Sequence, residues 1–219
     1  MQALAERLDE AARGRVLKRI DALQFSALKT VSPGPHELHG RVLDDVGRRA
    51  KYLIFSFGDI KVLAHLSQGG RVDLEQPPKS TKPKMAVVRF VFEGAAILIK
   101  EFGHERKAAW WVLPADDEGP LEGLGPEPFS DEAAAIILES EDRRRLHTIL
   151  RDQRTIAGIG RGFTDDILHA ARISPFESLN ALTPGRRRLL LETTRDVLTR
   201  AVEKERERTG GLPTKLAGR

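Results

Sequence analysis

The sequence predicts an α+β fold of two domains, an N-terminal antiparallel β-sandwich with a leading helix and a C-terminal all-α domain. Short apolar runs with the alternation typical of strands, separated by tight turns, fill the first half of the chain. After Ser130 the apolar residues recur at helical spacing. Between these regions, Pro114 to Pro128 is acidic and rich in glycine and proline, as interdomain linkers are. We therefore expect a sandwich domain at 1–115, a linker at 116–130 and a helical domain at 131–219.

The leading helix is expected over residues 2–14. Leu4, Leu8 and Ala11 recur there at helical spacing, and Gly14 stands where helices commonly end. Amphipathic spacing of this kind predicts a helix that packs one face on the sandwich.

The sandwich is expected to contain two β-hairpins, because two pairs of strand-like runs are each joined by a short turn that contains glycine. These pairs are Tyr52–Phe57 with Ile60–Leu66 around Gly58-Asp59, and Ala86–Phe92 with Ala95–Ile99 around Glu93-Gly94. Further strands are expected at Arg41–Val46 and Ala109–Leu113. Gln76–Lys84 is rich in proline and lysine and predicts an exposed loop.

The helical domain begins with capping residues. Ser130 is a good N-cap, and Thr183 is expected to cap another helix, with Pro184 in its first turn, that runs towards Glu207. Between these helices an apolar stripe is interrupted by a run of arginines: Ile136, Ile137, Leu146, Ile149 and Leu150. Residues 210–219 are expected to be unstructured.

The positive charge is concentrated in the second part of the chain. Residues 1–140 hold 19 Lys and Arg against 21 Asp and Glu, whereas residues 141–219 hold 17 against 11. The basic part includes the arginine runs 143–145 and 186–188. Arginine suits bidentate contact with phosphates, which favours a polyanionic partner. The alternative is that these runs are the solvated faces of helices.

The composition excludes several classes of protein. The chain has no cysteine, which excludes disulfides and thiolate metal sites and is typical of a cytoplasmic protein. No apolar run approaches the roughly 20 residues that cross a bilayer, so we expect no membrane association. The histidines and carboxylates lack metal-ligand spacing. We expect no metal, no cofactor and a monomeric protein.

The segment Arg151 to Pro175 carries the clearest functional pattern. Gly158 and Gly160 lie in a short apolar turn, where glycine lets a ligand approach the backbone closely. Thr164 is expected to cap the following helix, with Asp165 and Asp166 in its first turn. A turn that exposes N–H groups before a helix predicts a phosphate site. A tight packing turn is the alternative.

Several motifs in this chain resemble those of the formamidopyrimidine-DNA glycosylase and endonuclease VIII family. Asp152 to Gly160 reads DQRTIAGIG and is similar to the family's helix–two-turns–helix element. Arg48 to Tyr52 reads RRAKY, His65-Leu66 begins a turn motif of the family, and Leu124 to Pro128 reads LGPEP, as in its linker. The resemblance runs from Met1 to about Gly211.

The resemblance implies excision of oxidised bases by a DNA glycosylase that is also an AP lyase. Such proteins use an N-terminal proline amine as nucleophile, a neighbouring glutamate for proton transfer, and β,δ-elimination to cleave the strand. Here Met1 and Gln2 are expected inside the first helix, without that proline and glutamate. Either the chain begins at an internal methionine or it is a non-catalytic relative. The family's four-cysteine zinc finger is also missing from these residues.

The resemblance also assigns roles to individual residues. Lys51 matches the lysine that contacts the phosphate beside the lesion and assists catalysis. Arg161 takes the place of a phosphate-binding asparagine, after a turn in which Gly158 and Gly160 admit the DNA backbone. The remaining DNA-binding candidates match residues that enter the duplex or lie near its backbone: Gln68 in place of a methionine wedge, Arg106 and Lys107 in place of an Arg-Phe wedge, and His147 in place of a lysine.

Together these observations predict a base-excision repair protein that binds double-stranded DNA with a damaged base or an abasic site. DNA is expected to bind between the two domains, in the bacterial cytoplasm. The sequence as written predicts an inactive glycosylase and lyase, because its nucleophile is missing. The alternatives are a non-catalytic protein of the same fold that binds damaged DNA, and a partner of RNA or the ribosome.

Overall fold

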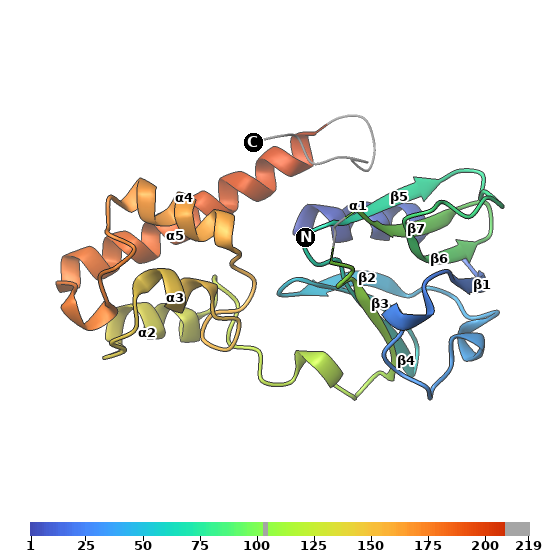
Figure 1. Cartoon of the computed structure of the whole chain (residues 1–219), viewed down its shortest axis with the longest axis horizontal. Coiled ribbons are helices and arrows are strands. Elements are labelled where there is room, and N and C mark those ends of the chain that lie inside the picture. The colour runs from blue at the N-terminus through green and yellow to red at the C-terminus, as the bar shows by residue number, and fades with distance from the viewer. Residues whose placement is uncertain (103–104, 209–219) are drawn as a thin grey trace. The chain divides into compact units, whose positions relative to one another are not determined.

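The computed structural model describes residues 1–102 and 105–208. It divides into two compact units, one from Met1 to Gly119 with Arg208 joined to it, and one from Pro120 to Glu207. The predicted α+β class is confirmed, since strands and a leading helix form the first unit and helices form the second (Figure 1). Among the described residues, no helix combines the length and hydropathy that a bilayer crossing requires.

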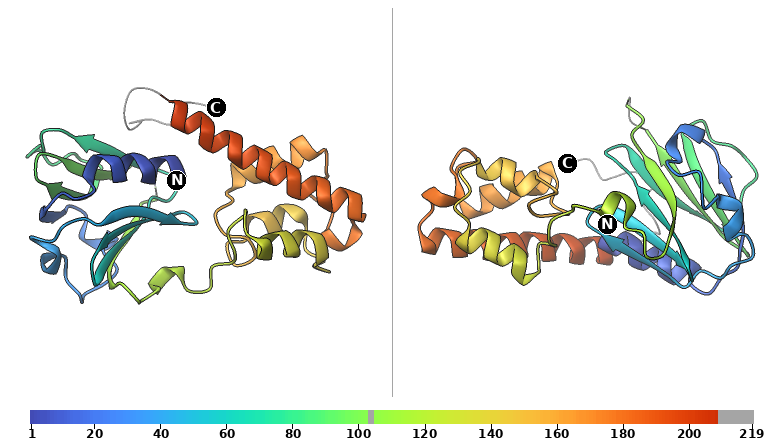
Figure 2. Two further views of the ribbon diagram at one scale, coloured as in Figure 1. Left: turned by 180° about the vertical axis from the view of Figure 1, so that it is seen from behind. Right: turned by 90° about the horizontal axis from the view of Figure 1, so that it is seen from below.

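The first unit is a β-sandwich of two antiparallel four-stranded sheets. One sheet has the order β1-β6-β7-β5, with β1 at Leu17–Ala22, β6 at Ala86–Phe92, β7 at Ala96–Glu101 and β5 at Gly70–Glu75. The other has the order β2-β3-β4-β8, with β2 at Asp45–Arg49, β3 at Tyr52–Phe57, β4 at Ile60–His65 and β8 at Ala109–Pro114. Helix α1, at Gln2–Ala12, packs against β2 (Figure 2).

Aromatic side chains fill the space between the two sheets. The rings of Phe55 and Phe90 stack with centroids 5.1 Å apart, and Trp110 meets Phe90 edge-on at 6.2 Å. All three side chains are almost completely buried. Their burial supplies much of the hydrophobic stabilisation of the sandwich, since large aromatic side chains remove the most apolar area from water.

Both predicted hairpins are present. Phe57 pairs with Ile60 across a turn in which Gly58 has φ +70°, and Gly94 has φ +76° in the turn between β6 and β7. These positive φ values explain the glycines. No helix or strand lies between residues 76 and 85, as predicted for the loop Gln76–Lys84.

The strand prediction for Arg41–Val46 is wrong in position. Val42 makes only an isolated bridge to Val16, whereas the strand itself is β2 at Asp45–Arg49. Its register is set by β3, because Asp45 pairs with Ser56 and Arg49 with Tyr52. Strands β1 and β5 were not predicted. Both lie at sheet edges, where charged side chains obscure the apolar alternation.

The second unit contains four α-helices among its described residues: α2 at Asp131–Glu139, α3 at Leu146–Arg151, α4 at Arg161–Ala171 and α5 at Pro184–Glu207. Helix α5 runs along α2 and α4 (Figures 1 and 2). Their shared core includes the apolar stripe that the sequence predicts, with Ile137, Leu146, Ile149 and Leu150 buried and Ile136 packed beside them. The stripe belongs to two helices.

The predicted caps of α2 and α5 are confirmed. Ser130 Oγ accepts a hydrogen bond from Ala133 N at 3.2 Å, and Thr183 Oγ1 accepts one from Arg186 N at 3.4 Å. Helix α5 ends at Glu207 as expected. Residues 210–219, expected to be unstructured, lie outside the described residues.

Candidate nucleic-acid interface

The turn between α3 and α4 is held together by the side chain of Gln153. Its Nε2 donates to Arg151 O at 2.7 Å and to Ile159 O at 2.8 Å, and its Oε1 accepts from Gly158 N at 2.9 Å. One amide group therefore joins both ends of the turn. The sequence segment DQRTIAGIG thus encodes a turn whose shape is fixed by its own residues.

The two glycines of this turn have different roles. Gly158 has φ +98°, which favours glycine, and its N–H donates to Gln153 Oε1. Gly160 is the N-cap of α4. The next three N–H groups have no acceptor inside the helix, because a helix leaves its first turn unpaired.

The predicted cap at Thr164 is wrong. Helix α4 begins three residues earlier, at Arg161, so Thr164 lies inside the helix with its side chain fully buried. Asp165 and Asp166 consequently lie in the second turn, and the first turn contains no acidic residue. The positive end of the helix dipole is therefore not compensated by a carboxylate, which favours binding of an anion there.

Arg161 places a cation at the same helix end. Its side chain is exposed, and among the residues that the structure describes its guanidinium has no hydrogen-bond or ion-pair partner. An exposed guanidinium beside unpaired N–H groups can bind a phosphate in a bidentate manner.

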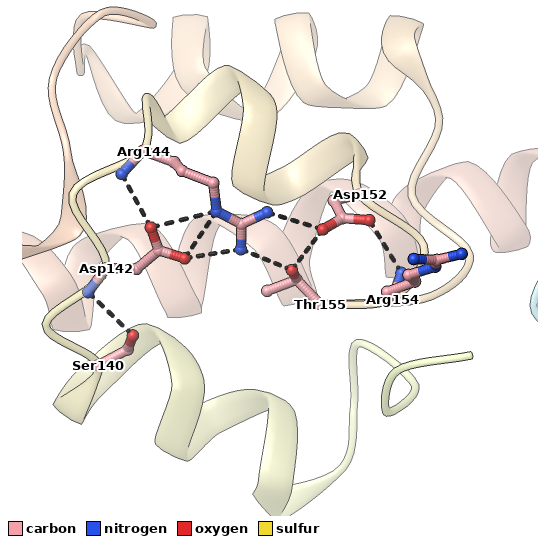
Figure 3. A network of polar contacts seen from close by, with 6 residues as sticks. All are labelled: Ser140, Asp142, Arg144, Asp152, Arg154 and Thr155. Atoms are coloured by element: carbon pink, nitrogen blue, oxygen red, sulfur yellow. Dashed lines mark hydrogen bonds and ion pairs between the residues drawn. The ribbon is translucent and has the colours of Figure 1, made fainter. Parts of the chain in front are cut away.

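Behind the turn, Arg144 links three polar side chains (Figure 3). Its guanidinium contacts Asp142 at 2.6 Å, Asp152 at 2.8 Å and Thr155 Oγ1 at 2.9 Å. Hydrogen bonds from Arg144 lower the pKa of both carboxyl groups below their ordinary values. Asp152 also accepts from Arg154 N at 3.1 Å, so this network fixes the start of the turn.

The linker motif LGPEP also packs on the turn. Gly125 N donates to Gln153 O at 2.8 Å, and Ala157 N donates to Pro126 O at 2.9 Å. A Cβ at Gly125 would lie 2.6 Å from Arg154 O, so this position requires glycine. The motif is therefore part of the helical unit.

In the sandwich unit, Lys51 lies in the two-residue turn between β2 and β3. Ala50, its partner in the turn, has φ +52°. The structure adds His65 to this position, which the sequence identified only as the start of a turn motif. Burial, and then the charge of Lys51, lower the pKa of His65 below its ordinary value. Its ring lies 4.8 Å from that of Tyr52, so His65 is held beside the lysine.

Gln68 and the loop after β7 lie next to each other. Gln68 is exposed in the turn before β5, and Phe102 N donates to the neighbouring Gly69 O at 3.0 Å. Arg106 and Lys107 are exposed on that loop. The structure therefore joins the residue after β7 to the turn that carries Gln68.

The far end of this loop is fixed by Glu101, whose side chain is only 1% exposed. Its two carboxylate oxygens accept from Lys107 N at 2.8 Å and Ala108 N at 2.9 Å. Both backbone amides would lack an acceptor without this carboxylate. Glu101 therefore fixes the backbone at Lys107 and Ala108 from inside the fold.

His147 and the start of α1 complete the predicted positions. His147 Nε2 lies 3.4 Å from Asp165 Oδ1, at the second turn of α4. Gln2 lies in α1 as expected, where its Oε1 accepts from Arg48 Nε at 2.8 Å and its Nε2 donates to Glu6 Oε1 at 2.9 Å. The Gln2 amide thus links α1 to β2.

Two family models match the chain. The model of the formamidopyrimidine-DNA glycosylase N-terminal domain matches residues 1–108, and that of the formamidopyrimidine-DNA glycosylase H2TH domain matches residues 124–210.

Curated relatives with the name formamidopyrimidine-DNA glycosylase are about 30% identical. The protein of Bacillus licheniformis is 31% identical over 87% of this chain and 72% of its own length. The protein of Symbiobacterium thermophilum is 31% identical over 87% of this chain and 65% of its own length. The protein of Halalkalibacterium halodurans is 30% identical over 92% of this chain and 76% of its own length.

Solved structures share the fold. The formamidopyrimidine-DNA glycosylase of Lactococcus lactis, non-covalently bound to DNA with an AP site, aligns with a TM-score of 0.85 at 23% identity, over 94% of this chain and 81% of that one. A variant of the same enzyme bound to DNA with Fapy-dG aligns with a TM-score of 0.85 at 22% identity, over 96% and 81%.

Proposed function

The chain belongs to the formamidopyrimidine-DNA glycosylase family, and from this membership we propose that it is a base-excision repair protein that binds duplex DNA at abasic or oxidised-base sites. The start of α4 carries the proposal. There Arg161 is exposed at a helix N-terminus that lacks acidic residues in its first turn. Such a helix end attracts phosphate through both the dipole and the guanidinium.

The turn before α4 supports this role because its own side chains fix its shape. Gln153 fixes both of its ends, and the Arg144 network fixes its start. A preformed backbone loses little conformational freedom on binding, so more of the interaction energy appears as affinity.

Lys51 and His65 supply a second phosphate contact in this proposal. Burial and the charge of Lys51 lower the pKa of His65, which favours the neutral imidazole, a form with one N–H to donate. Lys51 supplies the charge. Gly158, Gly160, Gln68, Arg106, Lys107 and His147 are proposed to line the DNA as the family resemblance implies.

We further propose that the side chain of Gln2 has a structural role and forms no covalent intermediate with DNA. The side-chain amide of Gln2 is not a nucleophile, and both of its ends are engaged, with Arg48 and with Glu6. The second candidate function is a non-catalytic protein of the same fold that binds damaged DNA. Lys51 then contributes its charge to binding.

Fluorescence anisotropy tests the binding proposal. The chain should bind a duplex with an abasic-site analogue more tightly than an intact duplex, and both affinities should fall steeply between 50 and 200 mM salt. Arg161→Ala should weaken binding about ten-fold and reduce the salt slope by about one. Arg172→Ala, at the opposite end of α4, is the matched control. Affinity that does not depend on salt, or stronger competition by structured RNA, would contradict the proposal.

Borohydride trapping on abasic-site DNA separates the binder from the enzyme. A Schiff base between a protein amine and the sugar aldehyde is reduced to a stable adduct, so the chain as written should give little or none. A strong adduct would refute the non-catalytic proposal, and its loss in Lys51→Ala would assign the amine.

A further inference from the structure

We propose that the helical unit carries a docking site for a partner protein, and that this site binds an acidic peptide segment with an apolar side chain between its carboxylates. The site, which we call the Phe176 patch, consists of Arg143, Arg145, Arg172, Pro175 and Phe176. This inference goes beyond the proposed function and does not depend on it, because none of these residues is proposed to contact the damaged duplex.

The Phe176 patch lies at the end of α4 that is remote from the Gln153 turn. Helix α4 begins at Arg161 and ends at Ala171, so Arg172 directly follows its last residue. At a rise of about 1.5 Å per residue, the two ends of this helix are about 15 Å apart. A phosphate bound at the start of α4 would therefore not cover the patch.

Phe176 is an aromatic residue that the fold holds in water, with 72% of its surface exposed. Its backbone belongs to a small turn, in which Ser174 N donates to Glu177 Oε1 at 3.1 Å and Glu177 N donates to Ser174 O at 3.2 Å. Leu146 N, at the start of α3, donates to Glu177 O at 2.7 Å. The ring therefore projects from a fixed backbone, and an aromatic side chain held in this way loses little conformational entropy on binding.

Three arginines near this ring are available to a ligand. Arg145 Cζ lies 5.3 Å from the centroid of the Phe176 ring. Arg143 precedes Arg145 in the segment that forms a β-bridge with Ser178, and Arg172 begins the loop between α4 and α5. All three arginine side chains are exposed, and among the residues that the structure describes their guanidinium groups have no hydrogen-bond or ion-pair partner.

The acidic residues of the same two segments do not neutralise these arginines. Residues 141–145 and 172–183 include three carboxylates, and each pairs with an arginine outside the patch: Glu141 with Arg187 at 3.5 Å, Asp142 with Arg144 at 2.6 Å (Figure 3) and Glu177 with Arg186 at 2.5 Å. The arginine run 143–145 thus contains one residue that holds the fold and two whose charge is uncompensated. The patch is therefore positive, which favours an acidic ligand.

A groove beside the ring adds apolar surface. It has a volume of about 620 Å³, and its lining includes Leu168, Ile173 and Pro175, the residue before the exposed ring. The lining also includes the carboxylate of Asp165, in the second turn of α4. The acidic part of the ligand is therefore expected at the other end of the groove, beside Arg172.

A peptide fits this combination better than a nucleic acid does. Phosphates would contact the guanidinium groups but would leave the Phe176 ring and the groove in water. An acidic segment that carries an apolar side chain can pair with the arginines and cover the ring at the same time. Aromatic residues and arginine are also the residue types that are enriched at the centres of protein–protein interfaces.

The test uses fluorescein-labelled peptides and fluorescence anisotropy. The first peptide has two aspartates on either side of a phenylalanine, the second has serine in place of that phenylalanine, and the third has lysines in place of the aspartates. The first should bind the native chain with a Kd below about 1 mM, and the other two more weakly. Phe176→Ala should weaken binding of the first peptide about ten-fold and remove the difference between the first and the second, because the ring that distinguishes them is gone.

Matched variants control for loss of a ring and for loss of a charge. Phe25→Ala removes a ring that is 83% exposed in the other unit and should leave peptide binding unchanged. Arg145→Ala should weaken binding of the first peptide about five-fold. Arg200→Ala removes the same charge from an exposed position further along α5 and should have little effect. Duplex affinity should stay unchanged in Phe176→Ala, because this variant removes no charge.

The other outcomes would overturn the inference. It fails if the native chain binds none of the peptides, or if Phe176→Ala still prefers the first peptide to the second. It also fails if Arg161→Ala abolishes peptide binding, because the peptide then occupies the proposed phosphate site. If Phe176→Ala weakens duplex binding as much as peptide binding, the patch binds nucleic acid instead.

This test and the test of the proposed function can fail separately. Peptide binding without binding of any duplex would refute the proposed function and leave the docking site standing. Duplex binding without peptide binding would do the reverse. An unchanged thermal unfolding midpoint for Phe176→Ala and Arg145→Ala ensures that folded proteins are compared.

Discussion

The turn before α4 and the loop after β7 both present cations to solvent, but they are held in different ways. The turn is fixed by several partly exposed polar side chains. Gln153 and Asp152 make hydrogen bonds with its backbone, and Arg144 pairs with Asp152. The loop depends on one buried carboxylate, Glu101, and on the close packing of Gly70 at the start of β5, which pairs with Glu101. Removing one side chain from a shared polar network should therefore lower the stability of the protein only slightly. Removing a single buried anchor should lower it by more.

The largest effect is expected from Gly70→Ala. A Cβ at this position would lie 2.1 Å from Leu66 O, so backbone must move. We expect the free energy of unfolding to fall by about 3 kcal/mol, measured by urea unfolding. Gly47→Ala is the control, because the nearest atom to its new Cβ, at 3.6 Å, is in ordinary contact. Equal losses of stability in both variants would show that the close packing of Gly70 has no special effect on stability.

Glu101→Ala should come next, at about 2 kcal/mol, because two amides lose their buried acceptor. Hydrogen exchange at the Lys107 and Ala108 amides should accelerate together. Glu101→Gln keeps only one acceptor oxygen, so its free energy of unfolding should lie between those of the native chain and of Glu101→Ala. If the two amides exchange at native rates in Glu101→Ala, the loop has another anchor.

In the turn, Gln153→Ala should cost about 1.5 kcal/mol, although three hydrogen bonds disappear, because water reaches this half-buried amide. DNA affinity should fall several-fold with no change in net charge. Gln153→Glu keeps the acceptor for Gly158 N and loses both donors. A loss of stability larger than that of Glu101→Ala would reverse the contrast between the two regions.

Arg144→Ala should cost about 1 kcal/mol, since its partners are partly exposed. Arg144 lowers the pKa of Asp142 and Asp152, so its contribution is present above about pH 4 and is lost as pH falls through the folded values. A double-mutant cycle with Asp142→Ala measures the coupling. A coupling that does not fall at any point as the pH is lowered towards acid unfolding would exclude the ion pair as its source.

The smallest effect concerns His65. Its pKa is lower in the folded protein, so its contribution to stability is complete above about pH 6.5, the unfolded value, and declines below it. His65→Gln should flatten the dependence of unfolding free energy on pH between 7.5 and 5.5. Removing the neighbouring charge in Lys51→Met should raise the pKa of His65 in an NMR titration. An unchanged pKa there would leave burial as the only cause.

Much of the fold could be predicted because local patterns agree with it. The hairpin turns at Gly58 and Gly94 lie between clear strand runs, and Ser130 and Thr183 mark helix starts. Edge strand β1 was missed because its alternation is broken by charged residues. The start of α4 was misplaced because a good capping residue, Thr164, is buried by tertiary packing instead.

The site was predictable to the extent that motifs carry it. Gly158, Gly160 and Arg161 lie in one turn as expected, whereas the function of Gln153 depends on backbone atoms up to six residues away. The position of Phe102 beside Gly69 requires the pairing of β5 with β7, which no local pattern specified.

The packing of Gly125 and Pro126 on the turn has a consequence for folding autonomy. If the chain were divided just before Asp131, Ala157 N and Gln153 O would lose their partners, although every helix would remain. The shortest stretch that we expect to fold alone therefore begins at Leu124, inside the segment that the sequence predicts to be a linker. If this helical unit was exchanged between proteins during evolution, residues 124–130 had to be exchanged with it.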